Sequence, residues 1–282
     1  MHNLPPLRDV LNRYTLSAKK SFGQHFLLDL NLTDKIARLC APHPVIAEIG
    51  SGPGGLTRSL LMAKTEHVFA LEKDARFIPV LEDIAKVSSK RLTILEADAL
   101  KVDLASLSEQ RPMRICANLP YNVGTKLVIN WLTASPVFWD KMVLMLQKEV
   151  AERIAASPSS KTYGRLTVLA QSISTVRIAF EVPASAFTPP PKVDSAVIVM
   201  DILPEEKRFS DLKTLGKITA ACFGQRRKML RKSLQNLAKE YGVDLKVWLE
   251  SANIDPTIRP ETLDITGFHK LTSVFTALRS DL

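Results

Sequence analysis

The tetrapeptide Asn118-Leu119-Pro120-Tyr121 combines residue types that suit chemistry on the exocyclic amine of a nucleobase. Such an amine is a poor nucleophile because its lone pair is delocalised into the ring. It improves when acceptors hold its two hydrogens, and the Asn118 side-chain oxygen and a main-chain carbonyl of the Leu119-Pro120 turn are candidate acceptors. Proline stiffens the turn, and Tyr121 offers a ring for base stacking. A plain proline turn after a strand explains the same residues without chemistry. Only the position of the tetrapeptide in the fold can distinguish the two interpretations.

Three further candidate positions precede the tetrapeptide, each at the predicted end of a strand. Gly50 and Gly52 lie in a glycine-rich turn between a strand and a helix, where a ligand can approach the backbone closely. Glu72 follows about 20 residues later, where an acidic side chain accepts hydrogen bonds from ribose hydroxyls. These features fit a dinucleotide as well as S-adenosylmethionine. Asp98 favours S-adenosylmethionine because it can accept a hydrogen bond from the adenine amino group, although a helix N-cap is the alternative.

The elements that must position these residues alternate along the chain. Apolar β-rich runs occur at 45–49, 67–71, 92–95, 114–117, 142–146, 176–182 and 196–202. Helical periodicity occurs between them at 56–63, 78–86 and 126–133. This alternation predicts a mostly parallel sheet with helices on both faces, in which ligands bind at the carboxyl ends of the strands. The last two runs leave no room for a normal helix between them, so we expect an antiparallel pair.

The pattern changes after Ile202. A short linker is followed by helical periodicity without a convincing strand. We therefore expect one domain at residues 1–203, with the catalytic site, and a small all-α domain at residues 204–282. Residues 1–44 are expected to form helices and a loop ahead of the sheet.

The bulk composition indicates an ordinary globular protein with a basic surface. The 282 residues are 46% hydrophobic and 24% charged, and the formal net charge is +9. Such a surface attracts phosphate backbones, although many proteins are equally basic without binding nucleic acid. Three widely spaced cysteines, without a CxxC pair, argue against a disulfide framework and against a metal site. No apolar run reaches the roughly 18 residues that span a bilayer, and the N-terminus lacks signal-peptide features, so we expect a cytoplasmic protein.

A basic run follows the predicted linker. Arg226, Arg227, Lys228, Arg231 and Lys232 place five basic residues within seven positions. On a single helix, 227 and 231 would be neighbours, as would 228 and 232, and such like-charge pairs repel mildly. This predicts a surface that faces phosphates; a solvated helix face is the alternative.

Four blocks in order carry a resemblance to a known family. They are Lys-Ser-Phe-Gly-Gln-His-Phe-Leu at 20–27, Glu-Ile-Gly-Ser-Gly at 48–52, Asn-Leu-Pro-Tyr-Asn at 118–122 and Phe-Thr-Pro-Pro-Pro-Lys-Val-Asp-Ser at 187–195. In this order they resemble the small-subunit ribosomal RNA adenine N6,N6-dimethyltransferases. The resemblance implies an α/β, Rossmann-like class I methyltransferase fold with a mostly parallel seven-stranded sheet, plus a small C-terminal all-α domain. The cofactor that it implies is S-adenosyl-L-methionine.

The resemblance also implies roles for individual residues. Gln24, His25 and Leu27 would close over the cofactor, with His25 acting by position rather than as a base. Gly50 would hold the methionine part of the cofactor, and Asn118 would contact both the cofactor region and the target amine.

Two further positions matter on the substrate side. Phe187 would stack on the target base opposite Tyr121; from the residues alone, an aromatic in a proline-rich loop is equally a packing anchor. Gly124 departs from the Ser or Ala that is more usual in the family after the tetrapeptide, which puts the local helix start in doubt.

The substrate implied by the resemblance is 16S ribosomal RNA in the small ribosomal subunit. The expected reaction is dimethylation of two adjacent adenines in a hairpin near its 3′ end, by a protein that acts as a monomer. Rival interpretations are a resistance-type enzyme acting on large-subunit RNA, a non-catalytic nucleic-acid scaffold, and an NAD-dependent oxidoreductase. The Gln-Arg-Arg-Lys run at 225–228 and Leu119 favour the small-subunit enzyme.

Overall fold

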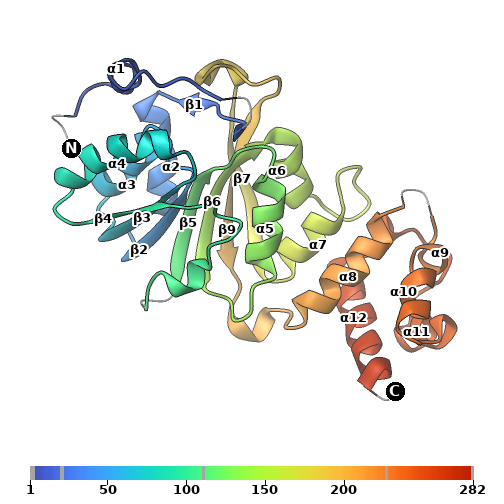
Figure 1. Cartoon of the computed structure of the whole chain (residues 1–282). Helices are drawn as coiled ribbons and strands as arrows, with labels where there is room; N and C mark the ends of the chain where they lie inside the picture. The colour runs from blue at the N-terminus through green and yellow to red at the C-terminus, as the bar shows by residue number, and fades with distance from the viewer. Residues whose placement is uncertain (1–3, 20–21, 110–111, 226–227, 281–282) are drawn as a thin grey trace. The chain divides into compact units, whose positions relative to one another are not determined.

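The structure, a computed structural model of the whole chain, describes residues 4–19, 22–109, 112–225 and 228–280. The chain divides into two compact units (Figure 1). The sheet unit comprises Met1–Asn130, Ala134–Ala151 and Arg177–Ile202, and the helical unit comprises Trp131–Thr133, Glu152–Val176 and Leu203–Leu282. The domain boundary between residues 203 and 204 stays a prediction.

Within the described residues, the central sheet has seven strands in the order β4-β3-β2-β5-β6-β9-β7. The strands are β2 (Val45–Ile49), β3 (His67–Glu72), β4 (Leu92–Glu96), β5 (Met113–Asn118), β6 (Trp139–Gln147), β7 (Ser174–Val182) and β9 (Ser195–Ile202). Neighbouring pairs from β4 to β6 are parallel, and β9 runs antiparallel to β6. The predicted mostly parallel seven-stranded sheet is therefore confirmed, with β9 and β7 as neighbours at one edge.

Helices follow the strands in the order that the sequence pattern predicts. The sheet unit contains α1 (Leu7–Arg13), α2 (Leu30–Cys40), α3 (Gly55–Met62) and α4 (Ile78–Lys86). Both α5 (Gly124–Leu132) and α6 (Lys148–Ile154) begin in the sheet unit and end in the helical unit. Short 3₁₀ turns are η2 (Ala75–Phe77), η3 (Leu104–Ser106), η4 (Ala184–Ala186), η5 (Glu205–Lys207) and η6 (Pro260–Thr262). Every residue of β2 is buried, as expected for a central strand with cover on both faces.

Residues 4–19 and 22–27, here called the N-terminal strap, lie along the sheet unit ahead of α2. The strap ends in β1 (Phe26–Leu27), which pairs antiparallel with β8 (Phe187–Thr188). The register places Phe26 opposite Thr188 and Leu27 opposite Phe187. Two-residue strands are too short to produce a hydrophobic period, so this ladder was not predicted. It brings the first and last of the four sequence blocks together.

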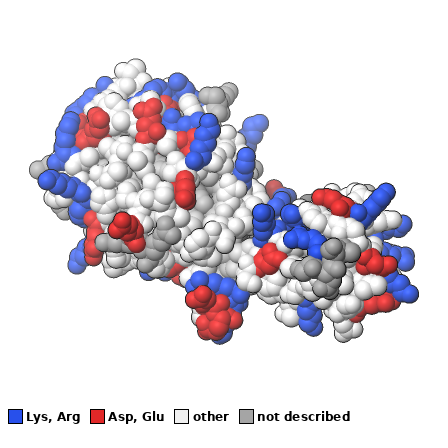
Figure 2. Space-filling view, turned by 60° about the horizontal axis from the view of Figure 1, so that its bottom comes forward, with Lys and Arg blue, Asp and Glu red and all other residues white. Residues whose placement is uncertain are grey.

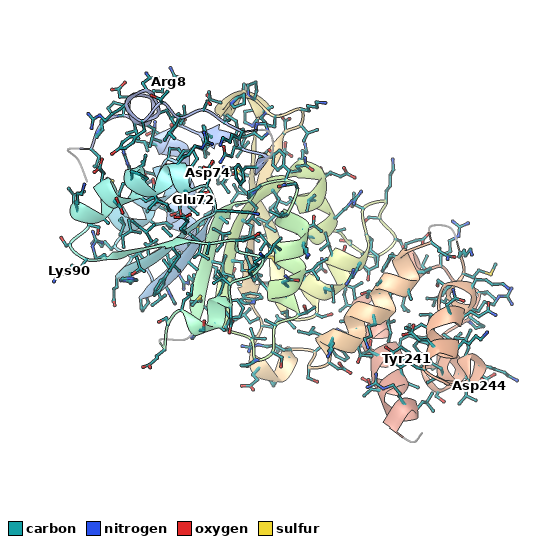
Figure 3. All side chains as sticks on the ribbon, viewed as in Figure 1. Arg8, Glu72, Asp74, Lys90, Tyr241 and Asp244 are labelled. Carbon is teal, nitrogen blue, oxygen red and sulfur yellow. The ribbon has the colours of Figure 1, made fainter. Side chains whose placement is uncertain are left out.

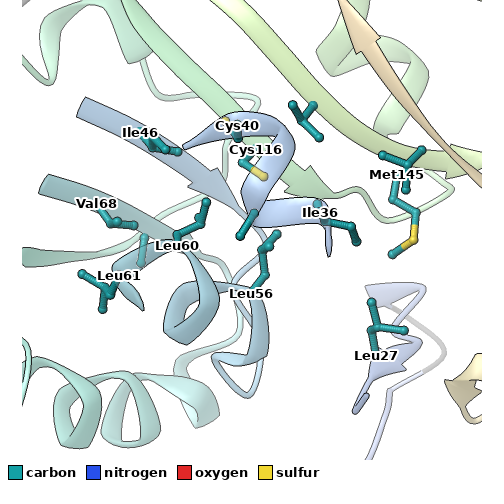
Figure 4. Close-up of a cluster of buried hydrophobic side chains, with 14 of the residues drawn as sticks. Leu27, Ile36, Cys40, Ile46, Leu56, Leu60, Leu61, Val68, Cys116 and Met145 are labelled. Atoms are coloured by element: carbon teal, nitrogen blue, oxygen red, sulfur yellow. The ribbon is translucent and has the colours of Figure 1, made fainter. Parts of the chain in front are cut away.

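The core of the sheet unit packs the sheet against α2 and α3 (Figure 4). Ile36 and Cys40 on α2 meet Leu60 and Leu61 on α3, and each is at most 1% exposed. Cys40, Cys116 and Cys222 are all buried free thiols, as expected for small core residues.

The helical unit is built from α7 (Arg165–Gln171), α8 (Leu212–Phe223), α9 (Leu230–Ser233), α10 (Gln235–Glu240), α11 (Leu245–Ser251) and α12 (Ile265–Ser280). Asp211 caps α8 by accepting the N–H of Thr214. Trp248, Phe268 and Phe275 form its buried centre. Among the residues that the structure describes, no helix combines the length and the apolar character needed to cross a membrane.

Candidate active site

A cavity of about 220 Å³ opens at the carboxyl ends of β2, β3, β4 and β5. Its wall includes the strap residues Gln24, His25 and Leu27, which no strand of the main sheet carries. Gly50, Gly52, Glu72, Asp98 and the tetrapeptide at 118–121 line the same cavity. Because the strands are parallel, residues far apart in the sequence meet at one edge of the sheet.

The glycine turn connects β2 to α3 in a conformation that favours glycine. Gly50 has φ +76°, Gly52 φ +49° and Gly54 φ +78°. A Cβ on Gly52 would meet no atom within 4 Å, so this part of the turn borders open space. A Cβ on Gly54 would lie 2.3 Å from Cδ1 of Ile84, so Gly54 is required for packing rather than for ligand access.

Two buried carboxyls stand beside the glycine turn. Glu48 is 1% exposed and accepts a hydrogen bond from Thr57 Oγ1 at 2.5 Å. Burial raises the pKa of Glu48 to about 7. Glu72 is 6% exposed, and burial raises its pKa as well. Its Oε2 accepts the N–H of Gly52 at 2.7 Å, which ties the end of β3 to the turn.

Asp98 forms the third acidic position, beyond the end of β4. Its Oδ1 accepts the N–H of Leu100 at 3.0 Å, and its Oδ2 accepts from Lys73 Nζ at 2.9 Å. The Lys73 ammonium lowers the pKa of Asp98. The carboxylate caps a turn rather than an α-helix, so the predicted alternative of a helix N-cap does not describe this position.

Three observations test whether S-adenosylmethionine suits this cavity. Among the described residues of its wall, the carboxyls of Glu72 and Asp98 stand with a single lysine, Lys73, so the cavity favours a cationic ligand over the anionic pyrophosphate of a dinucleotide. The buried Ser51 hydroxyl lies in the cavity wall beside the Glu48 carboxyl, whose pKa it lowers. The open space beside Gly52 leaves room for a ligand against the backbone. The residues present therefore fit this cofactor.

Asn118 ends β5 and faces the same cavity. Its Nδ2 donates to the main-chain oxygen of His25 at 3.5 Å. A carbonyl can only accept, so this contact assigns the amide and leaves Oδ1 as the acceptor of the side chain. A Cβ on Gly50 would lie 3.7 Å from the Asn118 carbonyl oxygen and 3.8 Å from Pro120 Cδ. The glycine turn and the tetrapeptide thus lie side by side, at the ends of the paired strands β2 and β5.

The turn after Asn118 distinguishes its two carbonyls. The Pro120 oxygen accepts the N–H groups of Val123 at 3.2 Å and Gly124 at 2.9 Å, which start α5. The Leu119 carbonyl is then the better candidate to accept a hydrogen from a substrate amine. A Cβ on Gly124 would lie 3.3 Å from Leu119 Cβ and from Leu146 Cδ2, which is tight for any larger residue. The glycine that departs from the family pattern therefore has a packing reason.

Tyr121 is held by contacts on both ends of its side chain. Its hydroxyl hydrogen-bonds to Ser195 Oγ at 2.6 Å. Its ring stacks on His25 with centroids 5.6 Å apart and planes at 28°. His25 Nδ1 bonds the Pro189 oxygen at 2.8 Å, so Nδ1 carries the hydrogen. His25 thus joins the strap, the tetrapeptide and the loop after β8.

Phe187 differs from its predicted setting. It is only 3% exposed and packs in the core cluster with Leu27. In this conformation its ring serves as the packing anchor that the residues alone also allowed. A stacking contact with a base would need the β8 segment to move.

The basic run predicted to face phosphates is described only in part, because Arg226 and Arg227 lie outside the described residues. Lys228, Arg231 and Lys232 are exposed. The prediction of one continuous helix is wrong for Lys228, because α9 begins at Leu230. The Leu230 and Arg231 N–H groups donate to the carbonyls of Ile258 and Pro256, so tertiary contacts set this helix start.

Comparison with known proteins decides the family. A family model described as ribosomal RNA adenine dimethylase matches residues 15–270. The chain is 50% identical over 280 residues to the ribosomal RNA small subunit methyltransferase A of Maricaulis maris, covering 98% of this chain and 97% of that protein. A protein of the same name from a Ruegeria species is 50% identical over 271 residues, with 94% and 95% covered. The chain belongs to the ribosomal RNA adenine dimethylase family.

Solved structures agree with this family assignment. A dimethyladenosine transferase from Plasmodium falciparum has a TM-score of 0.74 at 26% identity, covering 90% of this chain and 98% of that one. The 23S rRNA methyltransferase ErmE has a TM-score of 0.65 at 21% identity, with 89% and 99% covered, and shares the fold. The predicted family, the Rossmann-like methyltransferase fold, the enzyme class and the cofactor are therefore confirmed.

Sequence reasoning missed one part of this dimethylase-family site. Asp74 and Arg76 lie directly after Glu72, and they hydrogen-bond to the strap through Gln24 and Ser17. A charged pair after an acidic strand end resembles an ordinary helix start in the sequence, so only its distant partners identify it. Gln24, predicted as a cofactor contact, uses its side-chain amide within this network.

Proposed function

We propose that this chain transfers methyl groups from S-adenosylmethionine to the N6 amines of two adjacent adenines in a hairpin near the 3′ end of 16S ribosomal RNA. The reaction would belong to the biogenesis of the small ribosomal subunit. The observation that carries the proposal is that the glycine turn at Gly50 and the acceptor turn at Asn118 lie side by side in the wall of one acid-lined cavity. The relatives at 50% identity, which are named small subunit methyltransferases, support the choice of substrate.

The chain's own residues would hold the cofactor along the edge of the sheet. Bound S-adenosylmethionine would supply an electrophilic methyl group on a sulfonium. Gly50 and Gly52 would let its methionine part approach the backbone, Glu72 would accept hydrogen bonds from the ribose, and Asp98 would accept one from the adenine. His25 and Leu27 would close the cavity from the strap.

Asn118 and Leu119 would activate the target amine by accepting its hydrogens. Asn118 lines the cavity, and because its Nδ2 donates to the His25 carbonyl, Oδ1 is the side-chain atom that would accept a hydrogen of the amine. Acceptors placed where positive charge develops lower the barrier without donating a proton. A methylated amine leaves this step as a cation that is readily deprotonated, so the site needs no strong general base.

Tyr121 would provide the stacking surface for the target base. Its hydroxyl contact with Ser195 holds the ring in place. Phe187 would form the opposite wall only after the β8 segment has opened, because it is buried in this conformation. Extracting a base from an RNA helix costs a few kcal/mol, which such stacking helps to recover.

The basic run would contact the RNA backbone outside the catalytic cavity. We expect that neutralising Arg226, Arg227 and Lys228 together reduces RNA affinity and lowers the slope of log affinity against log salt by about 2 to 3. Filter binding across a salt series measures this slope. An unchanged slope would exclude the run as a phosphate contact.

We further propose that the protein acts in the cytoplasm as a monomer.

Methyl transfer to three substrates in parallel tests the function. Labelled S-adenosylmethionine is supplied with unmethylated small subunits, large subunits or duplex DNA, and the product nucleosides are analysed. Dimethyladenosine from small subunits alone supports the proposal. Label in large subunits would point to a resistance-type enzyme. A protein that binds the cofactor but transfers no label to any of the three would favour a scaffold.

Asn118→Ala tests the acceptor role within the same assay. It removes Oδ1 while the backbone of β5 remains paired with β2 and β6. We expect a loss of at least about 100-fold in kcat, comparable to removal of one oxyanion-hole donor in other enzymes, with cofactor affinity changed by less than about ten-fold. Normal turnover would refute the assignment.

A further inference from the structure

The carboxylate of Glu72 is held by two main-chain N–H groups from different segments. Gly52 donates to Oε2 at 2.7 Å and Asp74 donates to Oε1 at 2.8 Å. Figure 3 shows Glu72, the last residue of β3, close to Asp74. The backbone at residue 74 therefore helps to set the orientation of the carboxylate that would face the ribose.

Asp74 is in turn fixed by Arg76. Asp74 is 4% exposed, and its two oxygens accept from Arg76 Nε at 2.9 Å and Arg76 Nη2 at 2.5 Å. This two-point contact between a guanidinium and a carboxylate is geometrically specific. Arg76 holds the pKa of Asp74 down at about 2, so the pair is ionised at neutral pH.

The same pair holds the N-terminal strap. Gln24 Nε2 donates to Asp74 Oδ2 at 2.9 Å, and Arg76 Nη1 donates to the Ser17 carbonyl at 3.2 Å. The other end of the Gln24 amide, Oε1, accepts from the Lys19 N–H at 2.9 Å and from Arg76 Nη2 at 3.4 Å. A continuous chain of hydrogen bonds thus runs from the strap to Glu72.

We propose that Asp74 and Arg76 are positioning residues that latch the strap to Glu72 and thereby set the affinity for the cofactor. Gln24 acts in this latch as a link and not as a direct ligand of the cofactor. His25 and Leu27 follow Gln24 closely and line the cavity, so a closed latch keeps them over it. The inference rests on the proposed use of S-adenosylmethionine.

A second contact of the strap separates this latch from simple attachment. The Tyr14 hydroxyl donates to Asp83 Oδ2, which lies on α4. The Asp83 side chain is 37% exposed and also pairs with Lys86. If any attachment of the strap were sufficient, loss of the Tyr14–Asp83 contact would weaken cofactor binding as much as loss of Arg76.

The effect of Arg76 on the cavity is expected to be local rather than long-range. In Figure 2, Lys and Arg side chains on the visible face are interspersed with Asp and Glu. Removal of one cation from such a surface changes distant potentials little because salt screens them. An effect of Arg76 on cofactor affinity would therefore come from its direct contacts.

The test uses the full chain and five variants: Arg76→Met, Gln24→Met, the double variant, Arg76→Lys, and Tyr14→Phe as the matched control, which removes only the hydroxyl that donates to Asp83. Calorimetry measures the Kd for S-adenosylmethionine in the absence of RNA. Turnover on small subunits at varied S-adenosylmethionine gives kcat and the KM for the cofactor. We expect each latch variant to raise Kd and KM about ten-fold while kcat at saturating cofactor falls less than about three-fold. The double variant should be no more than about two-fold weaker than the poorer single variant, because both break one chain of contacts. Tyr14→Phe should bind the cofactor like the wild type, and Arg76→Lys should bind it more tightly than Arg76→Met.

The outcomes separate the latch from the function on which it rests. Failure of the wild type to bind S-adenosylmethionine would overturn the proposed function itself. Wild-type binding with an unchanged Kd for Arg76→Met would overturn the latch alone. If the losses of affinity multiply in the double variant, or if Tyr14→Phe loses as much affinity as Arg76→Met, the contacts attach the strap independently and the latch is refuted.

Discussion

Replacing Glu48 with glutamine should make the cofactor-free protein more stable than the wild type at pH 8, but not at pH 4.5. Glu48 lies on the central strand β2, where it is 1% exposed. Burial is the main cause that raises its pKa from 4.5 to about 7, and the nearby Glu72 adds to the effect while the Thr57 hydroxyl opposes it. Glutamine keeps the shape of the side chain and an oxygen for Thr57, but it cannot ionise.

The magnitude follows from proton binding by the two states of the protein. The folded state binds the proton of the Glu48 carboxyl more tightly than the unfolded state does. The contribution of this proton to the stability of the wild type is therefore fully present below pH 4.5 and is lost as pH rises through about 7. At 1.36 kcal/mol per pH unit, the interval from 4.5 to about 7 corresponds to about 3 kcal/mol. The free energy of unfolding of Glu48→Gln, relative to that of the wild type, should therefore rise by about 3 kcal/mol between pH 4.5 and pH 8.

Urea unfolding followed by circular dichroism at pH 4.5, 6 and 8 measures this difference. Glu66→Gln removes an exposed carboxylate and controls for the change in net charge. If the stability difference between Glu48→Gln and the wild type is the same at all three pH values, Glu48 is not a neutral acid in the folded protein. The reasoning from burial would then fail.

Two further predictions concern the glycine turn and the stacking ring. Gly54→Ala should lower the free energy of unfolding by about 1–2 kcal/mol, because φ is +78° and the new Cβ would crowd Ile84; Gly216→Ala, with nothing within 4 Å, should not destabilise. Urea unfolding compares the two. Tyr121→Phe, which loses only the hydroxyl contact to Ser195, should reduce kcat/KM less than about ten-fold, whereas Tyr121→Ala should reduce it by about 10- to 100-fold. Equal losses in steady-state methylation assays would exclude stacking as the role of the ring.

Much of the site could be predicted because its residues end consecutive parallel strands. Gly50, Glu72 and Asp98 follow three strands whose apolar runs are plain in the sequence, and Asn118 ends the fourth. Parallel strands bring their carboxyl ends to one edge, so the order of motifs was sufficient to place these residues around one cavity. Their roles toward cofactor and substrate remain predictions.

Other features depend on contacts between segments far apart in the chain. The β1–β8 ladder joins Leu27 to Phe187, and its two-residue strands leave no periodicity to detect. Burial of Phe187 follows from that ladder and from core packing. The start of α9 depends on carbonyls at Pro256 and Ile258, so the helical period of the basic run alone predicted it wrongly.

The sequence by itself determined the type of sheet, the family and the set of residues at the strand ends, because local periodicity and motif order carry that information. Only the tertiary structure decided that Gln24 pairs with Asp74, 50 positions away in the chain. Hydrogen-bond partners across such a distance are set by how the strap packs on the sheet, and no local pattern encodes them. The position of β2 between its neighbours in the folded sheet also removes Glu48 from water, which is the physical reason for its raised pKa.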